Sequence, residues 1–196
     1  MAITPPPFPP EPPGWIDARF GTARGLVRLM LSYGETALRL ASVRAPEAAE
    51  VRRLVFVCHG NICRSAFADV AGAEAGLVTA SFGLSASHGA PAHPPVVAIA
   101  GEMGIDLDRH RATAKEAYQP QPGDLLLAME ARQLRWIAAD ERLAHLPRTL
   151  LGLYTRPALP HLHDPYRLND PYTRTCLQRI ASAIPRLSSR FPKAVR

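Results

Sequence analysis

The stretch VFVCHGNICRSA, from Val55 to Ala66, decides the fold of this chain. Residues 52–57 form a short apolar and β-branched run that is typical of a buried parallel strand. The alanine-rich segment from Ser65 to Gly76 is predicted to be a helix that ends at the glycine. Cys58 therefore lies at the carboxyl end of a strand and just before a helix, where open α/β sheets bind their ligands.

The rest of the chain alternates between strand-like and helical segments. Further strands are expected at 78–86, 124–129 and 149–154, and helices at 94–103, 130–145 and 171–189. This alternation predicts an α/β fold with a doubly wound, four-stranded parallel sheet and helices on both faces.

The N-terminal segment differs in character. Residues 1–16 are rich in proline, which favours an extended tail, with docking to a proline-reading module as the alternative. Residues 17–50 are predicted to be an extension with a helix over 17–45. One apolar face of this helix is expected to pack on the domain, and it carries Leu26, Met30, Tyr33, Ala37 and Leu40. Dimerisation through the helix and contact with a membrane surface are the alternatives. The main domain is expected at 51–190, followed by a C-terminal tail at 191–196.

Composition narrows the class of protein. The 196 residues suffice for one domain with a core, and a net charge of +6 is compatible with an anionic partner. The arginines are scattered and no nucleic-acid-binding motif is present, so we expect no nucleic-acid partner. No apolar run approaches the about 18 residues of a membrane span, and no secretory signal is evident. Three cysteines do not form a disulfide framework, which favours a reducing, cytoplasmic compartment.

The loop from Cys58 to Arg64 has the composition of a phosphate cradle. Its backbone N–H groups, the start of the following helix and one planar guanidinium can match the oxygens of a phosphate dianion. A thiolate at the base of such an electropositive loop is stabilised and becomes a nucleophile. Gly60 and Asn61 tolerate the positive φ of a tight loop, and the Ser65 hydroxyl can donate to the thiolate. Cys63 is a candidate disulfide partner for Cys58 under oxidation.

Two other interpretations of Cys58 are weaker. A cysteine that ends an apolar strand can be a small core residue, and the spacing C-x5-R alone is a weak signal in an arginine-rich chain. The longer string C-x-G-N-x-C-R-S, between a strand and a helix, is far more restrictive. A structural zinc site at Cys58 and Cys63 would need two further ligands, so no metal and no other cofactor is expected.

The sequence resembles the low-molecular-weight protein tyrosine phosphatase family over roughly residues 52–190. The C-x5-R-S loop carries the resemblance, followed in order by GIDLDRHRA (104–112), DLLLAME (124–130), LLGLY (150–154) and DPYRLND (164–170). The family implies a two-step, metal-free hydrolysis of phosphotyrosine through a phosphocysteine, with an oxyanion held in the loop. It also implies a tyrosine-phosphorylated protein or a tyrosine kinase as the partner.

The resemblance also implies a general acid in a D-P-Y motif. Both Asp164 and Asp170 begin such a motif, and Asp164 fits the family position, with Asn169-Asp170 as the pair that follows. Asp170 is instead expected to cap the last helix, with Pro171 at its first position. Asp164 is therefore the predicted acid.

The walls of the pocket depart from the family pattern. Substrate contacts are expected from the loop residues His59, Gly60, Asn61, Ile62 and Cys63, and from Tyr166 and His88. His59 is larger than expected, Arg167 replaces a second tyrosine, and only His88 is sizeable within 85–91. We expect His93, His110 and His145 at the surface or at helix ends, and no metal at His161, His163 and Asp164.

Three rival functions remain open from the sequence. An arsenate reductase of this fold needs two further neighbouring cysteines, whereas only Cys176 remains. An arginine phosphatase has a threonine where this chain has Ile62, and an aliphatic side chain there favours a flat phenyl ring. A non-catalytic phosphopeptide-binding scaffold would not need the complete set of Cys58, Arg64, Ser65 and Asp164.

Overall fold

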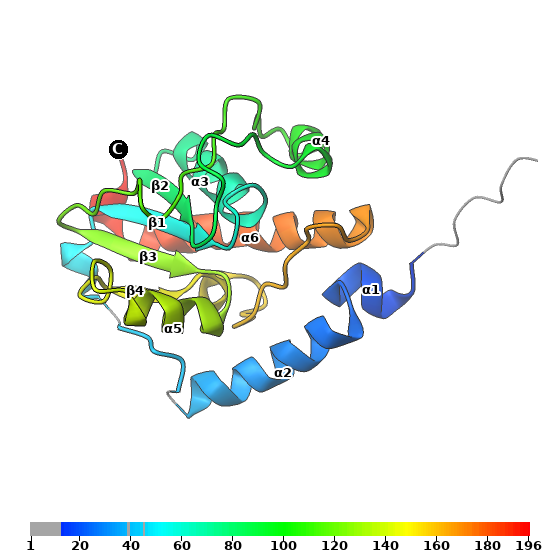
Figure 1. Cartoon of the computed structure of the whole chain (residues 1–196), viewed down its shortest axis with the longest axis horizontal. Helices are drawn as coiled ribbons and strands as arrows, with labels where there is room; N and C mark the ends of the chain where they lie inside the picture. Colours follow the sequence, from blue (N-terminus) through cyan, green and yellow to red (C-terminus); the bar gives the residue numbers. More distant parts are fainter. Residues whose placement is uncertain (1–12, 39, 45) are drawn as a thin grey trace, which may run out of the picture.

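The computed structural model describes residues 13–38, 40–44 and 46–196, and its centre is a parallel sheet (Figure 1). The strands are β1 (Arg53–Cys58), β2 (Thr79–Gly83), β3 (Asp124–Ala128) and β4 (Arg148–Leu150), in the order β2-β1-β3-β4. All three pairings are parallel. The predicted four-stranded parallel α/β fold is confirmed.

Side-chain alternation along β1 creates two cores. Leu54 and Phe56 point to the face covered by α3 (Arg64–Glu74), α4 (Pro94–Glu102) and α6 (Asp170–Arg190). Val55 and Val57 point to the other face, which α5 (Ala131–Ala139) covers. Helices thus lie on both faces, and Cys58 is left at the carboxyl edge of the central strand pair.

Several predicted elements end earlier than expected. The strand expected at 149–154 stops at Leu150 and becomes a 3-10 helix, η2 (Leu151–Tyr154). There the Gly152 carbonyl accepts from the Leu159 N–H at 2.8 Å, and a Cβ on Gly152 would collide with the Leu159 carbonyl oxygen. The strand expected at 78–86 ends at Gly83, because the following N–H groups donate to the Cys58 and His59 carbonyls. The helix expected at 130–145 ends at Ala139, before a turn in which Asp140 accepts from the Arg142 N–H.

The cap of the last helix is also corrected. Asn169, not Asp170, is the N-cap of α6, and its side-chain oxygen accepts a hydrogen bond from the Tyr172 N–H at 2.8 Å. Asp170 and Pro171 occupy the first two helical positions. At the other end, Pro192–Ala194 form the 3-10 helix η3, and the Ala194 carbonyl accepts from Val78 N–H.

The N-terminal extension is two helices rather than one. The prediction of a continuous helix over 17–45 is wrong, because Gly21, with a φ of 79°, separates α1 (Trp15–Phe20) from α2 (Ala23–Ala37). A short 3-10 helix, η1 (Ala48–Glu50), precedes β1. Most of the proline-rich segment predicted as a tail lies outside the described residues. Within those residues, no helix is long and apolar enough to cross a membrane.

The predicted packing face of the extension is wrong as well. Gly25, Leu29 and Ser32 are the buried residues of α2, whereas Met30 and Tyr33 are exposed. Ala37 and Leu40 of the predicted stripe are also exposed, so this stripe does not form the face that packs on the domain.

Candidate active site

The loop between β1 and α3 curls around the Cys58 sulfur. The Asn61 N–H donates to Sγ at 3.2 Å, and Ser65 Oγ lies 2.9 Å from the same sulfur. Asn61 has a φ of 53°, a conformation that asparagine tolerates better than most residues. The loop therefore places a buried thiol against two hydrogen-bonding groups.

Asn61 braces the loop from behind. Its Nδ2 donates to Ser65 Oγ at 2.8 Å and to Ser81 Oγ at 3.0 Å, while its Oδ1 accepts from the Thr113 N–H at 2.7 Å. The Asn61 carbonyl lies 2.8 Å from His110 Nε2. His110, expected at the surface or a helix end, thus supports the loop, a role that no local pattern in the sequence indicates.

Arg64 is fully buried between two carboxylates. Its Nη1 donates to Glu130 Oε1 at 2.7 Å and to the Leu162 carbonyl at 2.7 Å, and its Nη2 lies 2.6 Å from Asp164 Oδ2. Burial by itself would lower the pKa of Arg64, but Asp164 and Glu130 outweigh it and raise that pKa well above its usual value. Arg64 therefore carries a permanent charge at the loop.

Glu130 was not predicted as part of the site. It is buried, and although burial favours its neutral form, Arg64 lowers the pKa of Glu130 to about 2. Its second oxygen lies 2.6 Å from Nε of Arg132. The available signal was a carboxylate just after β3, the strand next to β1, at the edge where ligands bind.

Asp164 lies at the mouth of the loop and Asp170 does not. The Asp164 side chain is 31% exposed and lines the cavity above Cys58, whereas Asp170 is exposed at the start of α6. The Arg64 Nε has no hydrogen-bond partner among the described residues. An unpartnered guanidinium N–H buried in this loop suits an oxyanion.

The cavity above the sulfur has a volume of about 110 Å³ and is lined by Cys58, His59, Gly60, Ile62, Cys63, Asp164 and Tyr166. His88, predicted as the other wall, is exposed and does not line it; its Nδ1 lies 3.4 Å from the Ala114 N. His93 instead contacts the Tyr166 ring, with centroids 4.9 Å apart. His93 is also the N-cap residue of α4, as expected for a helix end.

The two other thiols are held neutral. Burial raises the pKa of Cys63 far above its usual value, and burial raises the pKa of Cys176 to about 12. All three cysteines are buried and free. No group of three metal-ligating side chains that could hold an ion occurs within 13–38, 40–44 and 46–196.

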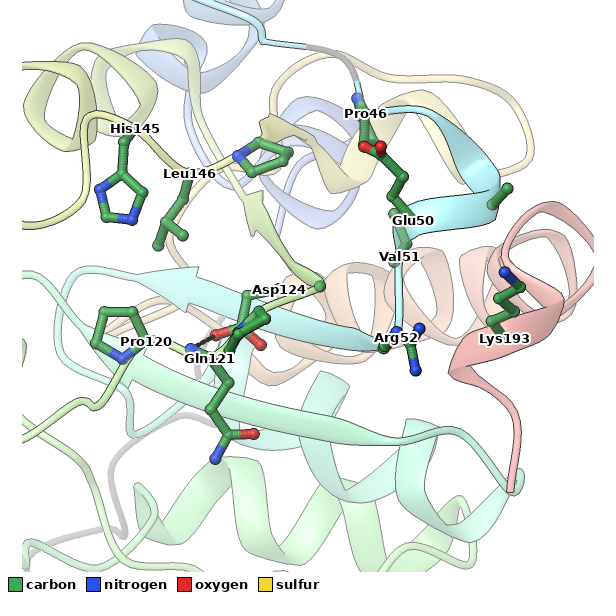
Figure 2. A pocket seen from close by; sticks show the side chains of 14 residues that line it. Pro46, Glu50, Val51, Arg52, Pro120, Gln121, Asp124, His145, Leu146 and Lys193 are labelled. Carbon is green, nitrogen blue, oxygen red and sulfur yellow. Dashed lines mark hydrogen bonds between the residues drawn. The ribbon is translucent and has the colours of Figure 1, made fainter.

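A second cavity of about 640 Å³ lies at the opposite end of the sheet (Figure 2). Arg52 and Asp124 place it at the amino ends of β1 and β3, away from Cys58. Its buried carboxylate, Asp124, already pairs with Arg53 at 2.6 Å. The candidate site is therefore the cavity at the carboxyl edge of the sheet, which Cys58 and Asp164 line.

Known proteins resemble this chain in sequence and fold. The family model "Low molecular weight phosphotyrosine protein phosphatase" matches residues 53–196. The probable low molecular weight protein-tyrosine-phosphatase EpsP of Ralstonia solanacearum is 36% identical over 91 residues, which are 45% of this chain and 63% of that protein. The EpsP of Ralstonia nicotianae is 34% identical over 85 residues. The matches thus span about three fifths of the length of these curated relatives.

Solved structures share the fold over most of their length. The tyrosine phosphatase Wzb from Escherichia coli K30, in complex with sulphate, has a TM-score of 0.61 and 25% identity, covering 71% of this chain and 97% of that one. The YwlE arginine phosphatase from Geobacillus stearothermophilus has a TM-score of 0.61 and 23% identity, covering 72% and 93%. The family model covers well over half of the chain, and the chain therefore belongs to the low molecular weight phosphotyrosine protein phosphatase family.

Proposed function

We propose that this chain is a protein-tyrosine phosphatase that hydrolyses aryl phosphate monoesters through a phosphocysteine. The observation that carries the proposal is the cradle itself. The Cys58 sulfur accepts from the Asn61 N–H, and the buried Arg64 guanidinium has Asp164 2.6 Å away at the mouth. A nucleophile and an acid thus line one small cavity, and a buried guanidinium that can clamp an oxyanion contacts the acid.

The first step transfers the phosphoryl group to sulfur. The Cys58 thiolate attacks phosphorus in line, so that the S–P bond forms while the P–O bond to the aryl group breaks. Arg64 and the loop N–H groups hold the equatorial oxygens. Protonated Asp164 gives its proton to the leaving oxygen, because a phenolate leaves poorly without one.

The second step hydrolyses the phosphocysteine. Asp164, now a carboxylate, accepts a proton from water as the water attacks phosphorus and the S–P bond breaks. Ser65 Oγ, 2.9 Å from the sulfur, can donate to the departing thiolate. The products are phosphate and the original thiolate, and no metal is needed at either step.

The walls of the cavity favour a phenyl ring. Ile62 and Tyr166 contribute apolar surface to the cavity lining, and His93 contacts the Tyr166 ring. The second candidate is an arginine phosphatase, since the YwlE arginine phosphatase has the same fold. Its guanidinium substrate would gain less from an aliphatic residue at position 62.

The deciding experiment measures phosphate release from p-nitrophenyl phosphate, a phosphotyrosine peptide and a phosphoarginine peptide with a chelator present. The wild type is compared with Cys58→Ser. Aryl phosphate turnover that is lost in the variant supports the proposal. Turnover of phosphoarginine alone would favour the second candidate. Silence on all three substrates would leave the non-catalytic scaffold as the better account.

The proposed partner is a tyrosine-phosphorylated protein, such as a tyrosine kinase, in the cytoplasm. Three buried, free thiols support a reducing compartment. A fluorescent fusion of the full chain should give cytoplasmic signal, and a signal confined to an oxidising compartment would contradict this assignment.

We also propose a homodimer through α2. The outer face of this helix exposes Val27, Met30, Leu31 and Leu38, each by more than half. Gly34 has open space around it, so a second helix can approach closely there.

Sedimentation velocity over a range of concentrations tests the dimer. Leu31→Glu should shift the wild-type dimer to monomer, whereas Val195→Glu, at another exposed apolar residue, should leave it intact. A monomeric wild type would overturn the proposal. A monomer that binds anionic vesicles through Leu31 would assign the face to a lipid surface instead.

A further inference from the structure

The elbow between α1 and α2 comprises residues 21–25. It is in direct contact with His163, the residue before the predicted acid Asp164. Thr22 Oγ1 lies 3.3 Å from His163 Nε2 and also accepts the Gly25 N–H at 2.9 Å. A Cβ on Gly25 would come within 2.9 Å of His163 Cδ2. The imidazole of His163 therefore lies against the backbone of the elbow.

Gly21 makes the same close approach. A Cβ at this position would lie 2.8 Å from Leu168 and Tyr172 side-chain atoms and 2.9 Å from His163 Cδ2. All three side chains belong to the segment that carries Asp164 or to the helix that follows it. The absence of a side chain at Gly21 is thus a condition for seating the elbow on this segment.

The opposite side of His163 is held by α6. The Tyr172 hydroxyl donates to the His163 carbonyl at 2.9 Å. The ring is held by the extension and the carbonyl by the last helix, so the peptide that joins His163 to Asp164 has little freedom. Asp164 in turn reaches Arg64 at 2.6 Å.

A second contact fixes the start of the same loop. The Tyr33 hydroxyl of α2 donates to the Ala158 carbonyl at 2.8 Å, and Arg64 holds the Leu162 carbonyl at 2.7 Å. The loop between η2 and α6 therefore lies between the extension and the phosphate cradle. In Figure 1 it is the orange segment that leads into α6 beside α1.

We propose that the α1–α2 elbow is a positioning element for the acid Asp164, and that Gly21, Thr22 and Gly25 act through His163. The proposal rests on the proposed function. The elbow precedes residues 53–196, the part of the chain that the family model matches. A proton donor misplaced by about 1 Å can lose about 100-fold in rate, so contacts outside the cavity can govern the acid.

The main test compares Gly21→Ala with Gly76→Ala. Both glycines have positive φ, 79° and 84°, so alanine strains the backbone at either position. Only at Gly21 would the new methyl group meet the side chains of His163, Leu168 and Tyr172. A Cβ on Gly76 would have no neighbouring atom within 4 Å. Gly21→Ala is expected to lower kcat/KM for phenyl phosphate at least ten-fold. The loss for p-nitrophenyl phosphate should be much smaller, because its leaving group depends less on protonation. Gly76→Ala should leave kcat/KM unchanged for both substrates.

Thr22 provides a second test that preserves the glycines. Thr22→Val removes the hydroxyl that contacts His163, and Thr22→Ser restores it. We expect valine to steepen the dependence of kcat/KM on the leaving-group pKa and serine to return it to the wild-type slope. Equal slopes for valine and serine would contradict a role for the hydroxyl.

A double-mutant cycle separates positioning from general damage. In an Asp164→Asn background the acid is gone, so Gly21→Ala should add no further selective loss on phenyl phosphate. An equal loss on both aryl phosphates, or a selective loss that persists without Asp164, would overturn the proposal.

Hydrogen exchange makes the test independent of catalysis. Amides at 158–168 should exchange faster in Gly21→Ala than in Gly76→Ala. If the wild type proves inactive, the proposed function fails, and this comparison still reports whether the elbow orders the loop. Unchanged exchange at 158–168 in Gly21→Ala would overturn the positioning role itself.

Discussion

Nη2 of Arg64 lies 2.6 Å from Oδ2 of Asp164, while Nη1 of the same guanidinium donates to Glu130. One buried cation thus joins the loop that holds Cys58 to the loop that holds Asp164. A phosphate dianion that engages Nη2 would release the Asp164 carboxyl towards the leaving oxygen. Glu130, on the far side of Arg64, would keep the guanidinium in place during this exchange.

Arg64→Lys should reduce kcat/KM for p-nitrophenyl phosphate by about 100-fold or more. Lysine keeps the charge but cannot hold Glu130 and phosphate with one planar group. Arg132→Lys is the matched control, because Arg132 pairs with the other oxygen of Glu130 outside the cavity. Similar losses in the two variants would contradict a clamp that is specific to Arg64.

Asp164→Asn should lower kcat/KM for phenyl phosphate by about 10²- to 10⁴-fold, the range of general acid catalysis. The same change at Asp170, which is exposed at the start of α6, should leave the rate nearly unchanged. Steady-state kinetics of both variants against the wild type give the answer. A larger loss from Asp170→Asn would reverse the assignment of the two D-P-Y motifs.

Asn61→Gly should destabilise the fold by about 2 kcal/mol and lower kcat/KM at least ten-fold. Glycine accepts the positive φ but removes the side-chain bonds to Ser65, Ser81 and the Thr113 N–H. Asn61→Ala removes the same bonds and adds about 1 kcal/mol of backbone strain. Urea unfolding ranks the variants, and a glycine variant as stable as wild type would show that the brace is dispensable.

His161 should cause the free energy of unfolding to fall as the pH is lowered from 6.5 to 4. Burial lowers the pKa of His161 from 6.5 to about 4, so the unfolded chain binds a proton in this window that the folded protein does not bind. The loss is at most about 3 kcal/mol. His161→Gln should flatten this part of the pH profile, and His145→Gln, at an exposed histidine, should not. Denaturant unfolding at each pH measures the free energy of unfolding. Parallel pH profiles for the wild type and His161→Gln would contradict the role assigned to His161.

Iodoacetamide at neutral pH should alkylate Cys58 alone. Burial raises the pKa of Cys63 and of Cys176, which keeps both thiols protonated and unreactive. Phosphate should slow the reaction by occupying the cradle above Cys58. Peptide mapping after brief labelling identifies the site, and modification of Cys176 in the folded protein would disagree with its complete burial.

Local patterns predicted the sheet and the nucleophile loop. The apolar run of β1 marks a buried strand, and the string from Cys58 to Ser65 places a thiol, a positive-φ residue and an arginine within one turn. These features depend on neighbours in the chain, so their chemistry can be predicted without the fold. The D-P-Y motif of Asp164 was also predicted to lie at the site, and Asp164 and Tyr166 of this motif line the cavity. The role of Asp164 as the acid stays a prediction.

Only the tertiary structure decided which distant groups surround the loop. Glu130 follows Arg64 by 66 positions and His110 follows Asn61 by 49, so neither contact has a local signal. The extension shows the same limit, because periodicity marks an apolar face but does not say which face meets the domain. Gly25 and Gly21 face inward because His163 needs their space. Sequence thus determined the strand, the loop and the position of the Cys58 thiol, while packing between distant segments determined what holds Arg64 and Asp164 in place.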